Sequence, residues 1–141
     1  MLPDKIVIET GSELYAGVST QPAGAVWPGH TGNDNLVLIL QGNVRLLFSN
    51  FKIDCKPGSL LFLPSGTERQ FCAIDAWAGI WCHFDLAGCG SVRPAWGESA
   101  LCRTLQLSRS DYRRIYAVFQ QICREAYRRR TGWRQLGYLL I

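Results

Sequence analysis

The stretch Lys56-Pro57-Gly58-Ser59-Leu60-Leu61-Phe62-Leu63-Pro64-Ser65-Gly66-Thr67-Glu68-Arg69-Gln70-Phe71 decides the fold of this chain. Pro57-Gly58 favours a type II turn, because proline sets φ at the first corner and glycine accepts positive φ at the second. Residues 60–63 form a short, wholly apolar run, which is typical of a strand buried on both faces. Pro64-Ser65-Gly66 breaks the chain again, and residues 69–73 resume an extended pattern. A buried strand between two tight turns predicts a compact antiparallel sandwich or barrel rather than a βαβ unit.

Further short extended segments lie on both sides of this stretch, separated by turns. We expect loops at 21–35, which contains Trp27 and His30, and at 88–98, which is rich in glycine. Many short strands at this spacing favour a barrel or sandwich over an α/β fold. Besides 60–63 and 69–73, the predicted strands are 6–8, 14–19, 36–40, 44–48, 51–55, 77–85 and 101–107.

The remainder of the chain has helical periodicity. Ser108 and Asp111 resemble a capping box, and apolar residues follow at steps of three and four. Thr131 is placed to cap a second helix. The chain stops inside the apolar pattern of that helix, so we expect it to be a piece of a longer protein. The apolar stripe of the first helix comprises Tyr112, Ile115, Tyr116, Phe119, Ile122, Cys123 and Ala126.

Composition and charge set further bounds. With 141 residues, 48% hydrophobic and 18% charged, the chain predicts one folded domain. No apolar run reaches the ~20 residues of a membrane span, and no signal peptide is evident, so we expect a cytoplasmic protein. Residues 1–107 carry 7 Lys/Arg against 9 Asp/Glu, whereas 108–141 carry 8 Arg against 2 acids. The break in charge coincides with the change from strand to helix pattern, so we expect a barrel over 1–107 and a helical segment over 108–141 within the same structural unit.

The cysteines and histidines do not have the spacing of a metal site. The six cysteines form no Cys-x-x-Cys pair, and the two histidines, His30 and His83, are far apart. A two-histidine site completed by Cys82 or Asp85 is the alternative. We interpret the cysteines as free, mostly buried thiols; three disulfides in a secreted protein would be the other reading. We expect neither metal nor cofactor.

The sequence contains no pattern typical of an enzyme. A Gly-x-Ser-x-Gly element, an HEXXH element and a phosphate-binding glycine loop are all missing. The acidic residues fall near turns or strand ends, where a solvated carboxylate is the default. We therefore predict no catalytic residues.

The predicted strand at 77–85 points to ligand binding. Period-2 geometry places Gly79, Trp81 and His83 on one face, and Ile80, Cys82 and Phe84 on the other. An indole ring offers a stacking surface, an imidazole offers a hydrogen bond, and glycine leaves room beside them. The first face therefore predicts a site for a small polar ligand. The alternative is a barrel filled by its own side chains.

Several motifs, in their order and spacing, resemble a known family. Gly58, Pro64 and Gly66 resemble the second motif of the cupin barrels. Metal-binding cupins have a histidine where this chain has Arg69, and their first motif has no match. The sequence is most similar to the sensor domain of AraC-type transcription regulators, over roughly residues 5–141. Their pattern of leucine-rich strand with Gln-Gly, Lys-Pro-Gly, Pro-x-Gly and Trp-rich strand corresponds to 36–42, 56–58, 64–66 and 77–84.

The resemblance implies a metal-free cupin-like barrel (a double-stranded β-helix or jelly roll) followed by two C-terminal helices. It implies that the barrel holds a small effector, sugar-like or another metabolite, with Trp81 packed on it. Arg69 shares a strand face with Phe71 and is placed to meet an anionic ligand. The predicted effector-binding residues are Trp81, His83, Phe71, Gln41, Arg69 and Trp27.

The resemblance also implies a homodimer formed through the helices, DNA binding through a further domain beyond residue 141, and a mobile arm at 1–13. The arginine-rich segment 124–134 has two interpretations, a nucleic-acid contact or the solvated face of a helix, and we favour the second. Two other functions remain open: a stand-alone cupin enzyme of the isomerase or epimerase type, and a ligand-free dimerisation module. The predicted dimerisation residues are Ile115, Phe119, Ile122, Trp133, Leu136 and Leu140.

Overall fold

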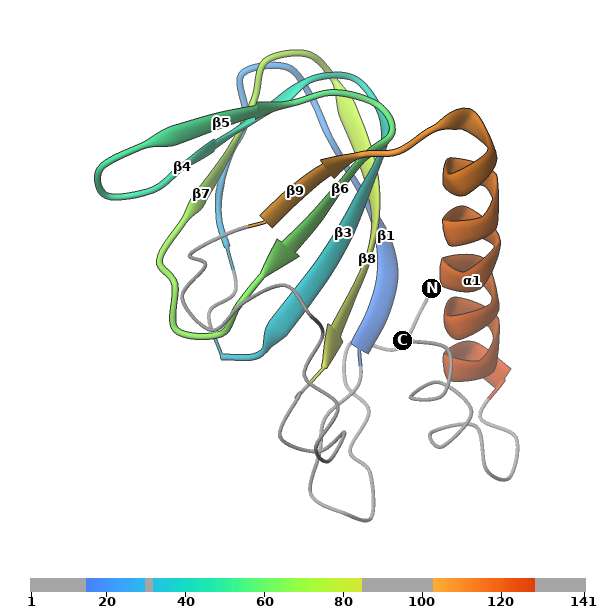
Figure 1. Cartoon of the computed structure of the whole chain (residues 1–141). Helices are drawn as coiled ribbons and strands as arrows, with labels where there is room; N and C mark the ends of the chain where they lie inside the picture. The colour runs from blue at the N-terminus through green and yellow to red at the C-terminus, as the bar shows by residue number, and fades with distance from the viewer. Residues whose placement is uncertain (1–14, 30–31, 85–102, 129–141) are drawn as a thin grey trace.

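The described part of the chain is mainly β, with one helix packed outside a pair of antiparallel sheets (Figure 1). The computed structural model describes residues 15–29, 32–84 and 103–128. The first sheet has the strand order β1(Tyr15–Gln21), β8(Trp77–Phe84), β3(Asp34–Gln41), β6(Ser59–Leu63), β9(Arg103–Gln106). The second has the order β2(Val26–Pro28), β7(Gln70–Ala73), β4(Val44–Leu47), β5(Lys52–Cys55).

The turn–strand–turn stretch folds as its sequence predicts. Gly58 has a φ of 86°, and the Ser59 N–H donates to the Lys56 carbonyl at 3.0 Å, which closes the turn. All five residues of β6 are buried. The strand lies between β3 and β9 in the first sheet, with one face toward the second sheet and the other toward the outer layer. The prediction of a strand buried on both faces is confirmed.

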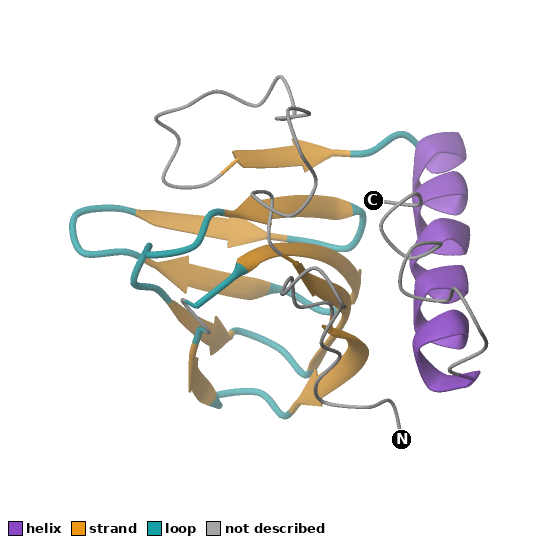
Figure 2. Ribbon diagram, turned by 90° about the horizontal axis from the view of Figure 1, so that it is seen from below, coloured by secondary structure: helices purple, strands orange, loops and turns teal. Residues whose placement is uncertain are grey.

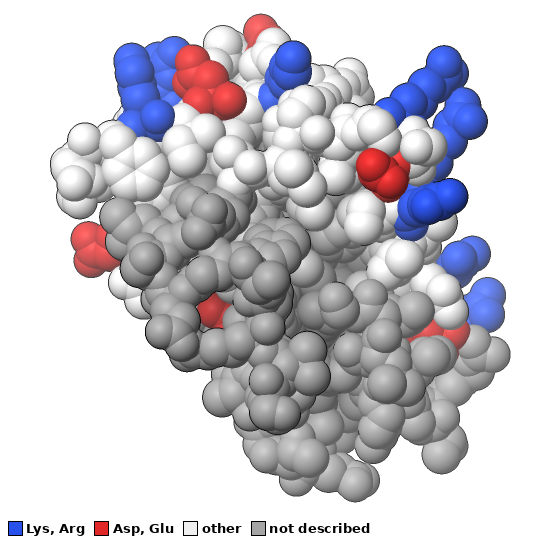
Figure 3. All heavy atoms as spheres, in the orientation of Figure 1, with Lys and Arg blue, Asp and Glu red and all other residues white. Residues whose placement is uncertain are grey.

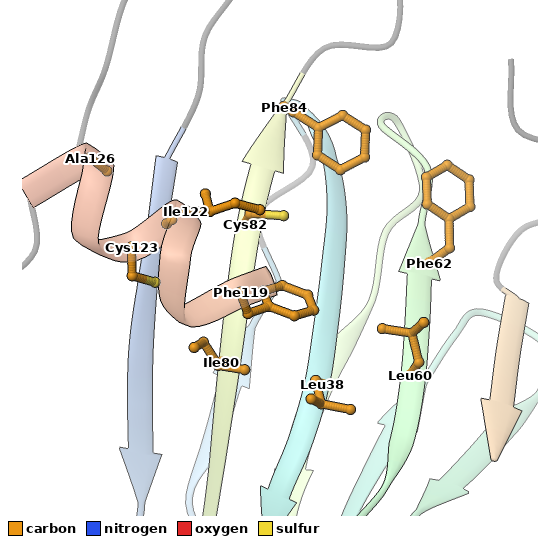
Figure 4. Packing of buried hydrophobic residues seen from close by; sticks show 11 residues of the cluster. Leu38, Leu60, Phe62, Ile80, Cys82, Phe84, Phe119, Ile122, Cys123 and Ala126 are labelled. Carbon is orange, nitrogen blue, oxygen red and sulfur yellow. The ribbon is translucent and has the colours of Figure 1, made fainter. Parts of the chain in front are cut away.

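Two hydrophobic clusters lie on opposite faces of the first sheet. The inner cluster, between the sheets, takes Leu61 and Leu63 from β6, whereas the outer cluster takes Leu60 and Phe62. Successive strand residues point to opposite faces, so one apolar strand serves both clusters. Figure 4 shows the outer cluster, where Phe119 of the helix lies over the strands.

Helix α1(Arg109–Arg128) covers β1 and β8 on the outer face of the first sheet. Figure 2 shows it as a layer of its own beside the strands. The Asp111 N–H donates to Ser108 Oγ at 3.1 Å, and this hydroxyl donates to the Asp111 carboxylate at 2.7 Å. Ser108 therefore caps the helix, as predicted, with aspartate in the position usually held by glutamate or glutamine.

One strand departs from the sequence prediction. Residues 21–35 were expected to be a loop, yet Val26–Pro28 pair with β7 as the edge strand β2. The segment contains a proline and glycines, which are typical of loops, but a single neighbour is enough to hold an edge strand. The predicted strand at 6–8, the loop at 88–98 and the second helix lie outside the described residues.

Candidate functional site

The two faces of β8 divide as period-2 geometry predicts. Ile80, Cys82 and Phe84 belong to the outer cluster under the helix. Trp81 and His83 point the opposite way, into the space between the two sheets. This inner space is therefore the candidate site.

A small cavity lies between the sheets at this point. Its volume is about 10 Å³, which is room for roughly one water molecule. The side chains around it therefore fill most of the interior, and a larger ligand requires some of them to move. The cavity is lined by Trp27, Gly29, Asn35, Val37, Phe71, Trp77, Trp81 and His83.

Trp81 is held in place by strand β1. Its indole Nε1–H donates to Ser19 Oγ at 2.8 Å. Its ring lies over Gly17, where an added Cβ would come within 2.8 Å of the Trp81 Cζ2 atom. The glycine thus makes room for the ring, and the serine fixes its orientation. The ring edge also meets His83, with centroids 5.1 Å apart and planes at 67°.

Trp77, which was not among the predicted site residues, is positioned in the same manner. Its Nε1–H donates to Gln21 Oε1 at 3.1 Å. Its ring lies over Gly79, where an added Cβ would come within 2.8 Å of the Trp77 Cζ3 atom. The room that the sequence assigned to Gly79 is therefore occupied by Trp77. The period-2 pattern that places Trp81 inside places Trp77 there as well, so the signal was available.

Aromatic rings continue from this strand into the second sheet. Phe71 stacks on Trp77 with centroids 5.8 Å apart and planes at 7°. Trp27, which is paired with Phe71 in the β2–β7 register, also has its ring centroid 5.8 Å from that of Phe71, with planes at 34°. Trp27 is 36% exposed, whereas Phe71 is 3% exposed. Trp27 is therefore the ring that separates this part of the interior from solvent.

Asn35 brings an unsatisfied polar group into the cavity lining. It lies opposite His83 in the β3–β8 register and is 5% exposed. Its side-chain oxygen is buried and has no hydrogen-bond donor within the described part of the chain. A buried acceptor without a donor costs about 1–3 kcal/mol. Asn35 was not among the predicted site residues, because it precedes the apolar run from which the strand was predicted.

The structure does not place the other two predicted effector residues in this cavity. Gln41 is exposed at the end of β3, where the register shifts between Ile39 and Gln41, so simple alternation no longer applies. Arg69 is buried, and its Nη1 donates to the Pro64 and Thr67 carbonyls at 3.1 and 3.0 Å. Arg69 lines an adjoining open groove of about 530 Å³.

Helix α1 uses its predicted dimerisation residues against its own sheet. Phe119 and Ile122 are buried in the outer cluster, and Ile115 packs against it. Trp133, Leu136 and Leu140 lie outside the described residues. The solvent face of the helix is basic, as Figure 3 shows along the edge where α1 lies. Its exposed arginines are Arg109, Arg113, Arg114, Arg124 and Arg128.

The described cysteines are free thiols, and burial raises the pKa of two of them. Cys82 and Cys123 both lie in the outer cluster, and desolvation raises the pKa of Cys123 to about 11. Such thiols stay protonated and behave as small apolar side chains.

Across residues 15–29, 32–84 and 103–128, no three His, Cys, Asp or Glu side chains are grouped to hold a metal ion. No helix in the described part has the length and apolar character to cross a membrane.

Two antiparallel sheets with aromatic side chains between them and a helix outside place this chain in the class of mainly β sandwich proteins. The sequence matches the model of the AraC-like ligand binding domain over residues 16–135. The chain therefore belongs to the AraC-like ligand binding domain family. No curated protein sequence matches it.

Two solved structures of ToxT have a similar fold. An apo variant of ToxT from Vibrio cholerae superposes with a TM-score of 0.60 at 8% identity, covering 76% of this chain and 46% of that one. ToxT from strain O395, bound to (E)-4-(8-methylnaphthalen-1-yl)but-3-enoic acid, gives 0.60 at 10% identity, covering 76% and 47%. A cupin superfamily protein from Desulfitobacterium hafniense gives 0.49 at 20% identity, covering 51% and 67%. The chain thus spans about half the length of the ToxT chains.

Proposed function

We propose that this chain is the effector-sensing part of a cytoplasmic AraC-type transcription regulator, and that a small effector binds between its two sheets. One observation carries the proposal: the Asn35 amide oxygen is buried beside four aromatic rings and has no donor among the described residues. A core that served packing alone would gain stability from an apolar residue at this position. A ligand with a hydrogen-bond donor supplies the missing partner.

Strand β8 offers a short route from the ligand to the helix. Trp81 lies on its inner face, and Ile80 and Cys82 lie on its outer face under α1. A ligand that moves Trp81 therefore acts on a strand whose opposite side supports the helix. If the ligand favours one position of β8 over another, it shifts the population of helix positions. Only strand β8 separates the proposed site from the helix at this point.

The helix is the element that would pass this shift to a partner copy. We propose homodimerisation through the C-terminal helical region and DNA binding through a domain outside this chain, as the family membership supports. Phe119 and Ile122 would then act by holding α1 on the sheet rather than by direct contact with a second copy. No catalytic role is proposed for any residue.

The filled-interior alternative has a specific observation in its favour. The cavity holds about one water molecule, so a ligand-free dimerisation module is the second candidate function. The two functions differ in one respect that an experiment reaches. A sensor gains stability from its effector, whereas a module does not.

The test is a thermal-shift screen of small metabolites on the wild type and on Trp81→Ala. A hit at 100 times its Kd stabilises the wild type by about 2.7 kcal/mol. We expect Trp81→Ala to abolish that shift. Ile74→Ala is the matched control, because Ile74 is 45% exposed and stands outside the cavity lining. A shift that survives unchanged in Trp81→Ala removes Trp81 from the site, and a screen without hits favours the module.

A further inference from the structure

We infer that the effector is an uncharged, flat aromatic molecule carrying one N–H or O–H donor, and that it enters by displacing the ring of Trp27. The inference rests on the proposed function, because it names the ligand class for the same cavity. It follows from three properties of the described lining: its charge, its shape and the unsatisfied amide oxygen of Asn35.

None of the described lining residues carries a permanent charge. They are aromatic, aliphatic or amide side chains together with a glycine and His83. Burying an ionised group without a partner is far more costly than burying a neutral one. The neighbouring cation, Arg69, lines the adjoining groove, where its Nη1 donates to two backbone carbonyls. A neutral ligand is the kind that this interior accepts.

The aromatic rings set the shape. Phe71 and Trp77 are nearly parallel, with planes at 7°, and Trp27 packs against Phe71 with planes at 34°. Two of these rings are fixed: Trp77 is hydrogen-bonded to Gln21, and Phe71 is 3% exposed. A flat ring gains offset-stacking or edge contacts on such surfaces.

Trp27 is the side chain best placed to leave. It is 36% exposed and belongs to a three-residue edge strand that is exposed throughout. Its indole is a flat, neutral ring already resting on Phe71 beside the cavity. The protein's own side chain thus occupies the place of a ligand of the same chemistry. A ligand must replace that ring, and this competition lowers its apparent affinity.

Asn35 specifies the donor. Its amide oxygen accepts from an N–H or O–H and cannot pair with a ligand that has neither. Indole and indene have the same shape, but only indole carries an N–H. A site that leaves a buried acceptor unpaired should disfavour indene by about tenfold or more.

The experiment measures the Kd of indole and of indene by calorimetry. A second measurement uses nuclear magnetic resonance of ¹⁵N-labelled protein with unlabelled ligand to follow the side-chain N–H signals of Trp77 and Trp81. In the wild type we expect indole to bind at least about tenfold tighter than indene and to shift both signals. Asn35→Leu should bind the two ligands equally. Trp27→Ala should bind indole more tightly than the wild type, whereas Trp27→Phe, which keeps a ring on Phe71, should not.

The outcomes separate this inference from the proposed function. Equal binding of indole and indene to the wild type overturns the role of Asn35 as acceptor for the ligand. This test uses the wild type alone, so it does not depend on whether a variant folds. If a neutral sugar or an aromatic carboxylate shifts the Trp81 signal and indole does not, the ligand class is wrong and the sensor function stands. If no molecule of the three classes shifts that signal in either the wild type or Trp27→Ala, both proposals fail.

Discussion

The hydrogen bond from Trp81 to Ser19 gives the sharpest test of how the cavity is built. Ser19→Ala removes the acceptor of a donor bond 2.8 Å long and leaves the indole N–H without its partner. An unsatisfied buried donor costs about 1–3 kcal/mol. Both side chains are half-buried, so water can reach the site in part and the lower end of the range applies. We expect a loss of about 1 kcal/mol, or roughly 3 °C in Tm for a chain of this size.

A double-mutant cycle isolates this bond from other effects of the serine. In a Trp81→Phe background the N–H is absent, so Ser19→Ala should cost almost nothing. The coupling free energy should be about 1 kcal/mol. Thr20→Ala is the control, because this hydroxyl belongs to the same strand and is exposed. Its loss should change stability by less than about 0.5 kcal/mol.

Urea unfolding of the four proteins in the cycle provides the free energies. The same variants should be titrated with any effector that the thermal-shift screen identifies. We expect Ser19→Ala to weaken effector binding, because Trp81 loses its fixed orientation. Equal costs of Ser19→Ala in the two backgrounds would show that the serine does not position Trp81, and the account of the site would then be wrong.

Three other predictions concern the site and the helix that lies behind it. In Gly17→Ala the new Cβ would lie 2.8 Å from the Trp81 Cζ2 atom, so the ring must move to reach the 3.4 Å of ordinary contact. This substitution should lower the free energy of unfolding in urea by about 1–3 kcal/mol. Raised pKa values of Cys82 and Cys123 mean that the folded state keeps protons that the unfolded chain loses at alkaline pH. Unfolding free energy should therefore fall between about pH 9 and 11, by about 1.4 kcal/mol per pH unit for each thiol, and Cys123→Ala should reduce that slope by about 1.4 kcal/mol per pH unit. Ser108→Ala removes the helix cap and should lower the unfolding free energy by about 1 kcal/mol, whereas no change would refute the cap.

Much of the architecture follows from local chemistry in the sequence. The Pro-Gly turn, the apolar run of β6 and the serine cap of α1 are each specified by residues within one turn or strand. The alternation along β8 likewise needs no knowledge of its neighbours, because successive side chains of any strand point to opposite faces. These predictions are confirmed.

The side chains that line the cavity were harder to predict from the sequence. Asn35 becomes part of the cavity lining only because β3 pairs with β8, which places its amide next to His83 and the aromatic rings. Gln41 leaves the inner face because of a register shift, which depends on how β3 and β8 pair. The proximity of Ser19 to Trp81 spans 62 positions and arises from the pairing of β1 with β8. Tertiary pairing, rather than local pattern, decides these contacts.

The resemblance to AraC-type sensors indicated the fold and the family, and the structure adds where the described residues lie. The predicted dimerisation residues of the first helix illustrate the difference. Phe119 and Ile122 have the periodicity of an interface helix, but the same periodicity serves to pack a helix on its own sheet. A single apolar stripe does not show whether the helix packs on its own sheet or on a second copy, so the dimer stays a prediction.

The central claim is that an effector binds between the sheets against Trp81. The most direct measurement follows the Trp81 indole N–H signal by nuclear magnetic resonance while the effector found in the screen is titrated to saturation. The account predicts that this signal shifts along the same binding curve as the calorimetric heat, and that the curve is lost in Trp81→Ala. Saturation of binding with the Trp81 signal unmoved would place the effector elsewhere and contradict the account.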